Sequence, residues 1–165
     1  MVCISHFWEK RKGKAIIIVA LENLPCPLCN GQMFTRSTCH RKAITASGEI
    51  KNFQLRVRQC RNCNKTHREL PKPLIPYKRY DGEAIAGIRN RPDIASCSEC
   101  TILAILCWLE WFIPYANQIC EKQQLILSFP LPKEPGKIIP AELALLVQLV
   151  ANSGNWRTTI QTSLC

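Results

Sequence analysis

The sequence predicts an α+β protein in which a small antiparallel β domain is followed by an α-helical region. Two Cys-X-X-Cys pairs in the first half enclose a stretch of alternating apolar and polar residues, which is typical of a half-buried strand. In the second half, apolar residues recur at helical spacing. At 165 residues the chain can bury one modest core. We expect the β domain over residues 15–70, a Pro-rich basic linker over 71–81, a helical region over 82–152 and an irregular tail over 153–165.

The four cysteines of the two Cys-X-X-Cys pairs are the candidate metal ligands. Cys26 and Cys29 form the first pair, and Cys60 and Cys63 form the second. One tight turn can place two thiolates at two corners of a tetrahedron, so two such knuckles complete a structural Zn²⁺ site. Four thiolates leave no open position for a catalytic water, so the zinc would hold the fold and do no chemistry. The alternatives are reduced core thiols or a thioredoxin-like redox pair.

The segments around the knuckles are predicted to be strands. Apolar and polar residues alternate over 53–58, which indicates a half-buried strand entering the second knuckle. A Ser-Gly turn at 47–48 would let residues 33–38 and 43–45 pair with that strand. Residues 16–21 would supply a further strand before the first knuckle. The expected result is a small antiparallel zinc ribbon.

Several other residues near the knuckles could take part in the site. Gly31 and Asn64 closely follow the two pairs, and both residue types tolerate the left-handed backbone conformation that such turns often need. The adjacent Cys39 and His40 lie between the pairs, and His67 follows the second pair. Each is an alternative ligand, but four soft sulfur ligands already complete the predicted site.

Positive charge is concentrated in the first half of the chain. The net charge is +10; residues 1–82 carry 16 Lys and Arg against 5 Asp and Glu, whereas residues 83–165 carry 6 against 7. The basic half is therefore the candidate surface for a polyanion. The alternative is a basic face that only keeps the protein soluble.

The segment 71–81 is predicted to be an extended linker. Its three prolines block helix formation. Lys78 and Arg79 stand beside Tyr77, and such a strip of cations and flat rings can follow a phosphate backbone. The alternative is a solvated linker whose tyrosines pack on the β domain.

The cysteine content and the apolar runs bear on location. Eleven cysteines fit either a secreted disulfide framework or a reduced metal-binding protein. The apolar run 15–21 leads directly into the first knuckle, so cleavage of a signal peptide there would cut into the β domain. This run and the run 101–116, which contains Glu110 and Pro114, are shorter than the roughly 20 apolar residues of a membrane span. We expect a cytoplasmic protein with reduced thiols and no membrane partner.

Helical patterns begin after the linker. Residues 82–90 form a short predicted helix that ends at Arg91-Pro92-Asp93. Ser96 and Glu99 fit a capping box at the start of a longer helix. A helix, a tight turn and a longer helix suit a helix-turn-helix-like unit. The longer helix is apolar nearly all round, however, which favours a place in the core or at a dimer contact over base reading.

Two more helices and a third Cys-X-X-Cys pair follow. We expect helices over 115–127 and from Pro140 to about Asn152. Cys97 and Cys100 stand at the predicted start of the long helix, where the helix dipole lowers a thiol pKa. Core thiols, a redox dithiol, and a second metal site with other cysteines of this half are the alternatives for this pair.

The residues at the end of the β domain resemble a known group of proteins. Residues 60–80 read CRNCNKTHRELPKPLIPYKRY and residues 26–31 read CPLCNG. Both resemble small uncharacterised bacterial proteins related to the zinc ribbons and helix-turn-helix regions at the N-termini of transposases. The resemblance covers residues 15–112 and departs from the group at Cys97 and Cys100. It implies DNA binding in a mobile-element or phage-like setting.

Together these observations predict a non-catalytic, transposase-related DNA-binding protein with Zn²⁺ as cofactor and double-stranded DNA as partner. A DDE-type transposase needs carboxylates grouped on a large α/β core, and Asp81 and Asp93 are the only aspartates, so no catalytic residue or small-molecule substrate is expected. The candidate phosphate contacts are Arg56, Arg58, Arg61, Lys65, Arg68, Lys78, Arg79, Arg89 and Arg91. The alternative is an RNA binder, or a zinc-stabilised interaction module that uses the apolar helices, which could also form a homodimer.

Overall fold

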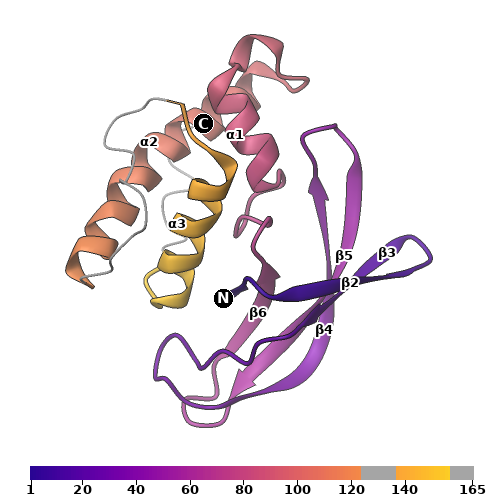
Figure 1. Cartoon of the computed structure of the whole chain (residues 1–165), viewed down its shortest axis with the longest axis vertical. Helices are drawn as coiled ribbons and strands as arrows, with labels where there is room; N and C mark the ends of the chain where they lie inside the picture. The colour runs from indigo at the N-terminus through magenta and orange to yellow at the C-terminus, as the bar shows by residue number, and fades with distance from the viewer. Residues whose placement is uncertain (124–136, 157–165) are drawn as a thin grey trace.

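A computed structural model of the chain describes residues 1–123 and 137–156. This part of the chain has a mixed α/β architecture, in which a curled sheet lies beside three α-helices (Figure 1). Of the expected irregular tail, residues 157–165 lie outside the described part.

Six strands form the sheet: β1 (Val2–Ile4), β2 (Phe7–Lys12), β3 (Ala15–Ala20), β4 (Met33–Ile44), β5 (Ile50–Cys60) and β6 (Thr66–Pro71). The strand β5 is central: β4 pairs with it in antiparallel orientation along its whole length. Its opposite edge is shared between β3, which is parallel to it, and β6, which is antiparallel. The strand β2 continues the sheet from β3, and β1 continues it from β6 in parallel orientation.

The sheet is therefore mixed, whereas the sequence predicted a purely antiparallel ribbon. The physical reason lies in the chain path. The strands β3 and β5 each lead into a cysteine knuckle, and the two knuckles meet at one end of the sheet. Both strands must therefore point toward that end, which makes them parallel where they pair.

The burial of β5 changes face along the strand. Phe53 and Leu55 are buried, as the alternation predicted, but beyond them Val57 is only half-buried while Arg58 and Cys60 are buried. At this point β4 carries a register shift between Thr35 and Ser37. A β-bulge increases local twist and bends the strand. The bulge therefore helps to curl the sheet, so that its two ends bury opposite faces.

The first helix confirms its prediction, and the second differs at its start. The helix α1 (Gly82–Asn90) follows Asp81, whose side chain accepts a hydrogen bond from the Ala84 N–H at 2.8 Å. The short 3₁₀ turn η1 (Pro92–Ile94) follows it. The helix α2 (Glu99–Lys122) is capped by Ser98, so the predicted capping box of Ser96 and Glu99 is wrong. Residue 98 still has an extended backbone, which makes Glu99 the first helical residue.

Helix α2 runs through Pro114, where the sequence predicted a break between two helices. Its 24 residues replace the predicted helices over 97–113 and 115–127, of which residues 124–127 lie outside the described part. By length and apolar composition alone α2 can cross a membrane, and 33% of its most apolar window is buried. Buried helices of soluble proteins meet the same criterion, and α2 packs against α1 and α3. The absence of a membrane partner stays a prediction.

Helix α3 (Pro140–Asn152) confirms its prediction and joins the helices to the sheet. Asn90 exchanges two hydrogen bonds of 2.9 Å with the backbone of Ile138, just before α3. Asn152, at the other end of α3, bonds the backbone N–H and C=O of Cys3 in β1 at 2.7 and 2.9 Å. The helix is therefore fixed at both ends.

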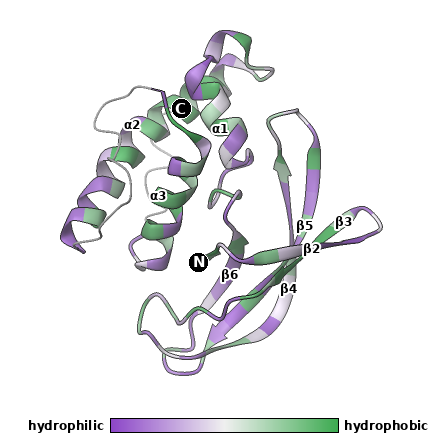
Figure 2. Ribbon diagram, in the orientation of Figure 1, coloured by the Kyte–Doolittle hydropathy of each residue, from purple (hydrophilic) through white to green (hydrophobic). Residues whose placement is uncertain are grey.

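The main core lies between the helices and the sheet. It joins Leu55 and Leu70 of the strands to Ile85, Phe112 and Leu143 of the three helices, all fully or almost fully buried. Figure 2 shows the hydrophobic character of β3 and α3. The buried face of α2 belongs to this core, and the helix-turn-helix-like assignment stays a prediction.

Candidate metal centre

The structure brings the four cysteines of the two knuckles together. We call Cys26, Cys29, Cys60 and Cys63 the cysteine cluster; their sulfur atoms all lie within 4.8 Å of one another. The Cys29–Cys60 pair is 3.4 Å apart and the Cys26–Cys63 pair 3.7 Å. Four sulfurs placed about 2.3 Å from a tetrahedral centre are about 3.8 Å apart. The spacing fits a four-thiolate metal site.

The two knuckles have the same backbone form. Asn30 and Asn64 each follow the second cysteine of a pair and have φ angles of 57° and 56°. Asparagine is one of the few residues that enters this left-handed region readily, so the Cys-X-X-Cys-Asn pattern itself favours the turn. For Asn64 this is the predicted conformation.

Gly31, in contrast, does not have a positive φ, so its predicted role is wrong. Its importance is steric. A Cβ atom at this position would lie 3.0 Å from the Cys60 sulfur and 2.8 Å from the side chain of Asn62. A glycine is therefore needed where the first knuckle passes close to the second.

Thiol ionisation in the cysteine cluster is uneven. The backbone N–H groups of Cys63 and Asn62 point at the Cys60 sulfur and lower its pKa to about 6. The Gly31 N–H lowers the pKa of Cys29, but the adjacent thiols, chiefly Cys60, outweigh it and raise that pKa to about 12. A thiol that donates its proton to a neighbouring sulfur is harder to ionise, and a metal deprotonates the thiols that coordinate it. The cluster can therefore hold a metal ion.

His67 contacts the cysteine cluster without belonging to it. Its Nε2 atom lies 3.4 Å from the Cys26 sulfur, and burial lowers its pKa to about 4, so the ring is neutral. A neutral ring in this place acts as a hydrogen-bonding neighbour of a metal ligand, a role that commonly fixes ligand orientation. Cys39 and His40, the other substitute ligands considered, lie in the middle of β4 and outside the cluster.

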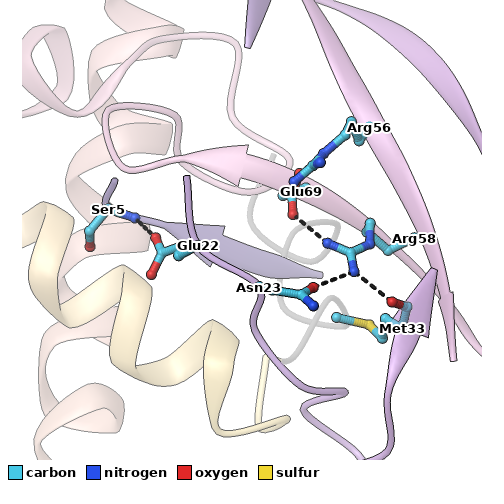
Figure 3. A network of polar contacts seen from close by, with 7 residues as sticks. All are labelled: Ser5, Glu22, Asn23, Met33, Arg56, Arg58 and Glu69. Atoms are coloured by element: carbon cyan, nitrogen blue, oxygen red, sulfur yellow. Dashed lines mark hydrogen bonds and ion pairs between the residues drawn. The ribbon is translucent and has the colours of Figure 1, made fainter. Parts of the chain in front are cut away.

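A buried ion-pair network supports the first knuckle (Figure 3). The carboxylate of Glu69, 3% exposed, lies 3.2 Å from the guanidinium of Arg58 and 2.5 Å from that of Arg56. Arg58 also donates hydrogen bonds of 2.6 Å to Asn23 and to the Met33 carbonyl, which lie just before and after the first knuckle. The network therefore connects β5 and β6 to both ends of the loop that holds Cys26 and Cys29.

Sequence reasoning missed this network. One sequence signal could have indicated it. Arg56 and Arg58 lie two positions apart in β5, and Glu69 lies in the neighbouring strand β6. Arg58 was assigned to phosphate contacts, but it is 5% exposed and its charge faces Glu69. This placement removes Arg58 from the candidate surface.

The remaining candidate phosphate contacts are distributed over several surfaces. Arg61, Lys65, Arg68, Arg79 and Arg91 are exposed, whereas Arg56, Lys78 and Arg89 are half-buried. The Nζ atom of Lys78 lies 4.5 Å from the ring centre of Trp108, and Arg89 lies 3.9 Å from Glu110. The structure brings Arg68, Lys78 and Arg79 to the rim of a single cleft, and it places Arg61 and Lys65 at the second knuckle.

The third Cys-X-X-Cys pair forms no comparable group. Cys97 is half-buried and Cys100 exposed, on either side of the Ser98 cap. Within residues 1–123 and 137–156, the cysteine cluster is the only group of three or more possible ligands. The second metal site considered for these cysteines is therefore not found in the part of the chain that the structure describes.

Comparison with known proteins gives one match. Residues 26–104 match the profile of a domain of unknown function, DUF6431. The match begins at the first cysteine of the first knuckle and extends through both knuckles and α1 into the start of α2. No curated protein and no solved structure matches the chain. The match assigns no activity and shows no relation to transposases.

Proposed function

We propose that the chain is a zinc-stabilised, non-catalytic protein that binds double-stranded DNA through its basic half. The observation that carries the proposal is the fate of the carboxylates in residues 1–82. Three of the five face the protein's own groups: Glu69 pairs with two arginines, Asp81 caps α1, and Glu22 accepts hydrogen bonds from the backbone. The Glu69–Arg58 pair removes one charge of each sign from the surface, so the basic half keeps its excess of exposed cations, which favours a polyanion as partner.

The exposed cations of this half are well placed for such contacts. Arg61 and Lys65 lie on the turn of the second knuckle, and Arg61 lies over the ring of Phe34 at 5.5 Å. A turn that is fixed by a metal can present cations with little loss of conformational freedom on binding. In this proposal zinc stabilises the fold that displays the charges and takes no part in a reaction.

The resemblance of residues 60–80 to transposase zinc ribbons belongs to the same proposal. It suggests a mobile-element setting, in which a non-catalytic chain recognises DNA. The charge pattern by itself favours RNA equally, because both polymers carry a phosphate backbone.

The test is fluorescence anisotropy of the zinc-loaded full chain with labelled random-sequence duplex DNA across a salt series. Double-stranded RNA serves as competitor. We expect a log–log slope of about −3 or steeper, at about 0.9 per phosphate contact, and weak competition by RNA. Absence of binding at about 50 mM salt, where electrostatic affinity is strongest, would refute the proposal.

A matched pair of variants locates the surface. The double variant R61A/K65A removes two exposed cations beside the cysteine cluster, and K122A removes an exposed cation from the half without net positive charge. We expect the slope to become shallower by about 1.8 in the double variant and to stay unchanged in K122A. The zinc content of each variant is measured in parallel, so that a loss of fold is not taken for a loss of contacts. Equal slopes in both variants would argue against phosphate contacts by Arg61 and Lys65.

A second candidate function is favoured by the exposed apolar face of α2. Leu103 is 60% exposed and Cys107 is exposed beside it. Apolar residues gathered on one exposed helix face indicate a protein contact. If the chain fails to bind nucleic acid and sediments as a dimer that L103E converts to a monomer, the interaction module becomes the better account.

A further inference from the structure

A cleft of about 670 Å³ opens on the sheet face formed by β4, β5 and β6. Thr38, Thr66 and Arg68 line it from the strands, and residues 77–79 line it from the segment that leads to α1. Figure 1 shows this segment leaving β6 beside the sheet. Cavities of about 300–1,000 Å³ are the usual size for small organic ligands. We call this cavity the basic cleft.

The basic cleft collects positive charge. Arg68 and Arg79 are exposed at its rim, and among residues 1–123 and 137–156 no aspartate or glutamate lines it. Arg41 lies behind them, and its pKa is lowered chiefly by burial and further by the nearby charge of Arg68. Like charges held together without a counter-charge create a site for an anion, because cations in a concave surface reinforce one another's field. Hydroxyl groups such as that of Thr66 add hydrogen-bond donors for phosphate oxygens.

An exposed aromatic ring is held at the same rim. Tyr77 has a φ angle of 59°, which is unfavourable for a bulky residue, and its side chain is 56% exposed. The guanidinium of Arg41 donates to the carbonyl of Ile75 and, at 2.7 Å, to that of Lys78. These two bonds bracket Tyr77 and fix the backbone on both sides of it. Unfavourable backbone angles that the surroundings enforce are concentrated at functional sites.

From these three features we infer that the basic cleft binds an unpaired nucleotide of a single-stranded nucleic acid. Its phosphate lies between Arg68 and Arg79, and its base stacks on Tyr77. Arg41 is a positioning residue, since its guanidinium bonds the backbone of the protein. The inference rests on the proposed function in that both require polyanion binding by the basic half, but it assigns a different class of ligand to a defined site.

The aromatic ring of Tyr77 is the feature that makes the basic cleft prefer a single strand to a duplex. Every unpaired base has a free face that can stack on an aromatic side chain, whatever its identity. In a duplex that face is covered by the neighbouring base pair, and exposing it requires flipping a nucleotide out of the stack. The phosphate contacts are open to both polymers, whereas stacking on Tyr77 favours the single strand.

The test compares oligothymidylate of about ten nucleotides with a duplex of equal length, both labelled, on the zinc-loaded full chain. The central variant is Tyr77→Asn, because asparagine accepts the left-handed backbone and so removes the ring while keeping the turn. Tyr77→Phe is the matched control that keeps the ring. Removal of one stacked base should weaken single-strand binding by about 5- to 150-fold. Tyr77→Phe should bind as the native chain does, and the duplex affinity of Tyr77→Asn should be unchanged.

Two further measurements locate the site. Arg68→Ala should weaken single-strand binding and make its salt slope shallower by about 0.7, whereas Arg36→Ala, which removes an exposed cation of β4 outside the cleft, should change neither. An oligonucleotide with 5-iodouridine should cross-link to Tyr77, as read by mass spectrometry of the peptides.

The outcomes separate the two proposals. If the duplex binds but Tyr77→Asn leaves single-strand binding unchanged, the inference is wrong and the proposed function stands. Full displacement of the oligonucleotide by inorganic phosphate at equal phosphate concentration would mean a bare anion site and would also overturn the inference. If neither polymer binds the native chain, both proposals fail, and an acidic protein becomes the partner to seek.

Discussion

Replacing Glu69 by glutamine tests the buried network beside the first knuckle. The change keeps the shape of the side chain but removes the negative charge that faces Arg58 and Arg56. Arg58 then stays 5% exposed with a full charge and only neutral acceptors, which are Asn23, the Met33 carbonyl and the amide oxygen of the new side chain. Breaking a buried ion pair from one side costs about 3–5 kcal/mol. For a chain of this length such a loss lowers the melting temperature by about 10 °C.

The matched control is Arg56→Met. The Arg56 side chain is 29% exposed, and its removal leaves Glu69 paired with Arg58, so we expect a loss of about 1 kcal/mol or less. The double variant R58M/E69L replaces the pair by apolar groups and should be more stable than E69Q alone.

The assay is urea unfolding followed by circular dichroism at one fixed, saturating zinc concentration, because bound metal adds its own stabilisation to the folded state. A free energy of unfolding for E69Q within about 1 kcal/mol of that for R56M would refute the reasoning, since it would mean that Arg58 is solvated in the variant.

Three further predictions concern the metal centre, helix α1 and pH. Cys60→Ser should abolish zinc binding in native mass spectrometry while Cys107→Ser, at an exposed position, keeps it; zinc retained by C60S would contradict the ligand set. Gly31→Ala should weaken zinc affinity at least about tenfold in a chelator competition, because the added Cβ would press on the Cys60 sulfur. Gly87→Ala is the contrasting change in α1: there is open space around this position, so the free energy of unfolding should rise by about 0.5–1 kcal/mol. Burial lowers the pKa of Lys78 from 10.5 to about 8, so the unfolded chain binds more protons between these values and stability should rise from pH 8 to pH 10. In urea titrations Lys78→Met should lack that rise, and an unchanged rise would assign it to another group.

The local elements could be predicted because their signals are local. Alternating residues around Leu55 indicated β5, and apolar spacing with Pro140 at the start indicated α3. The start of α2 was placed two residues early, because Ser96 and Ser98 both fit a cap and only the backbone at residue 98 decides between them. The break expected at Pro114 was wrong, since a proline removes one hydrogen bond and packing of the surrounding apolar residues can keep the helix intact.

The candidate sites differ in how far sequence reasoning reached them. The spacing of the cysteines was enough to group them. Each Cys-X-X-Cys turn brings two sulfurs together, and the β4–β5 hairpin between the two turns places both turns at the same end of the sheet. The basic cleft depends on contacts between distant segments. Arg41 reaches the carbonyl of Lys78 across 37 positions, and no sequence pattern records that approach.

By itself, the sequence determined the four cysteines of the candidate metal centre, the uneven distribution of charge and most of the strands and helices. These follow from chemistry that operates within a few residues: turn geometry, side-chain periodicity and composition. Only the tertiary structure decided which charges face solvent. Arg58 and Glu69 neutralise each other in the interior, whereas Arg68 and Arg79 meet at an open cleft. A charge acts over the distances that folding sets, and those distances are fixed by the packing of strands and helices far apart in the chain.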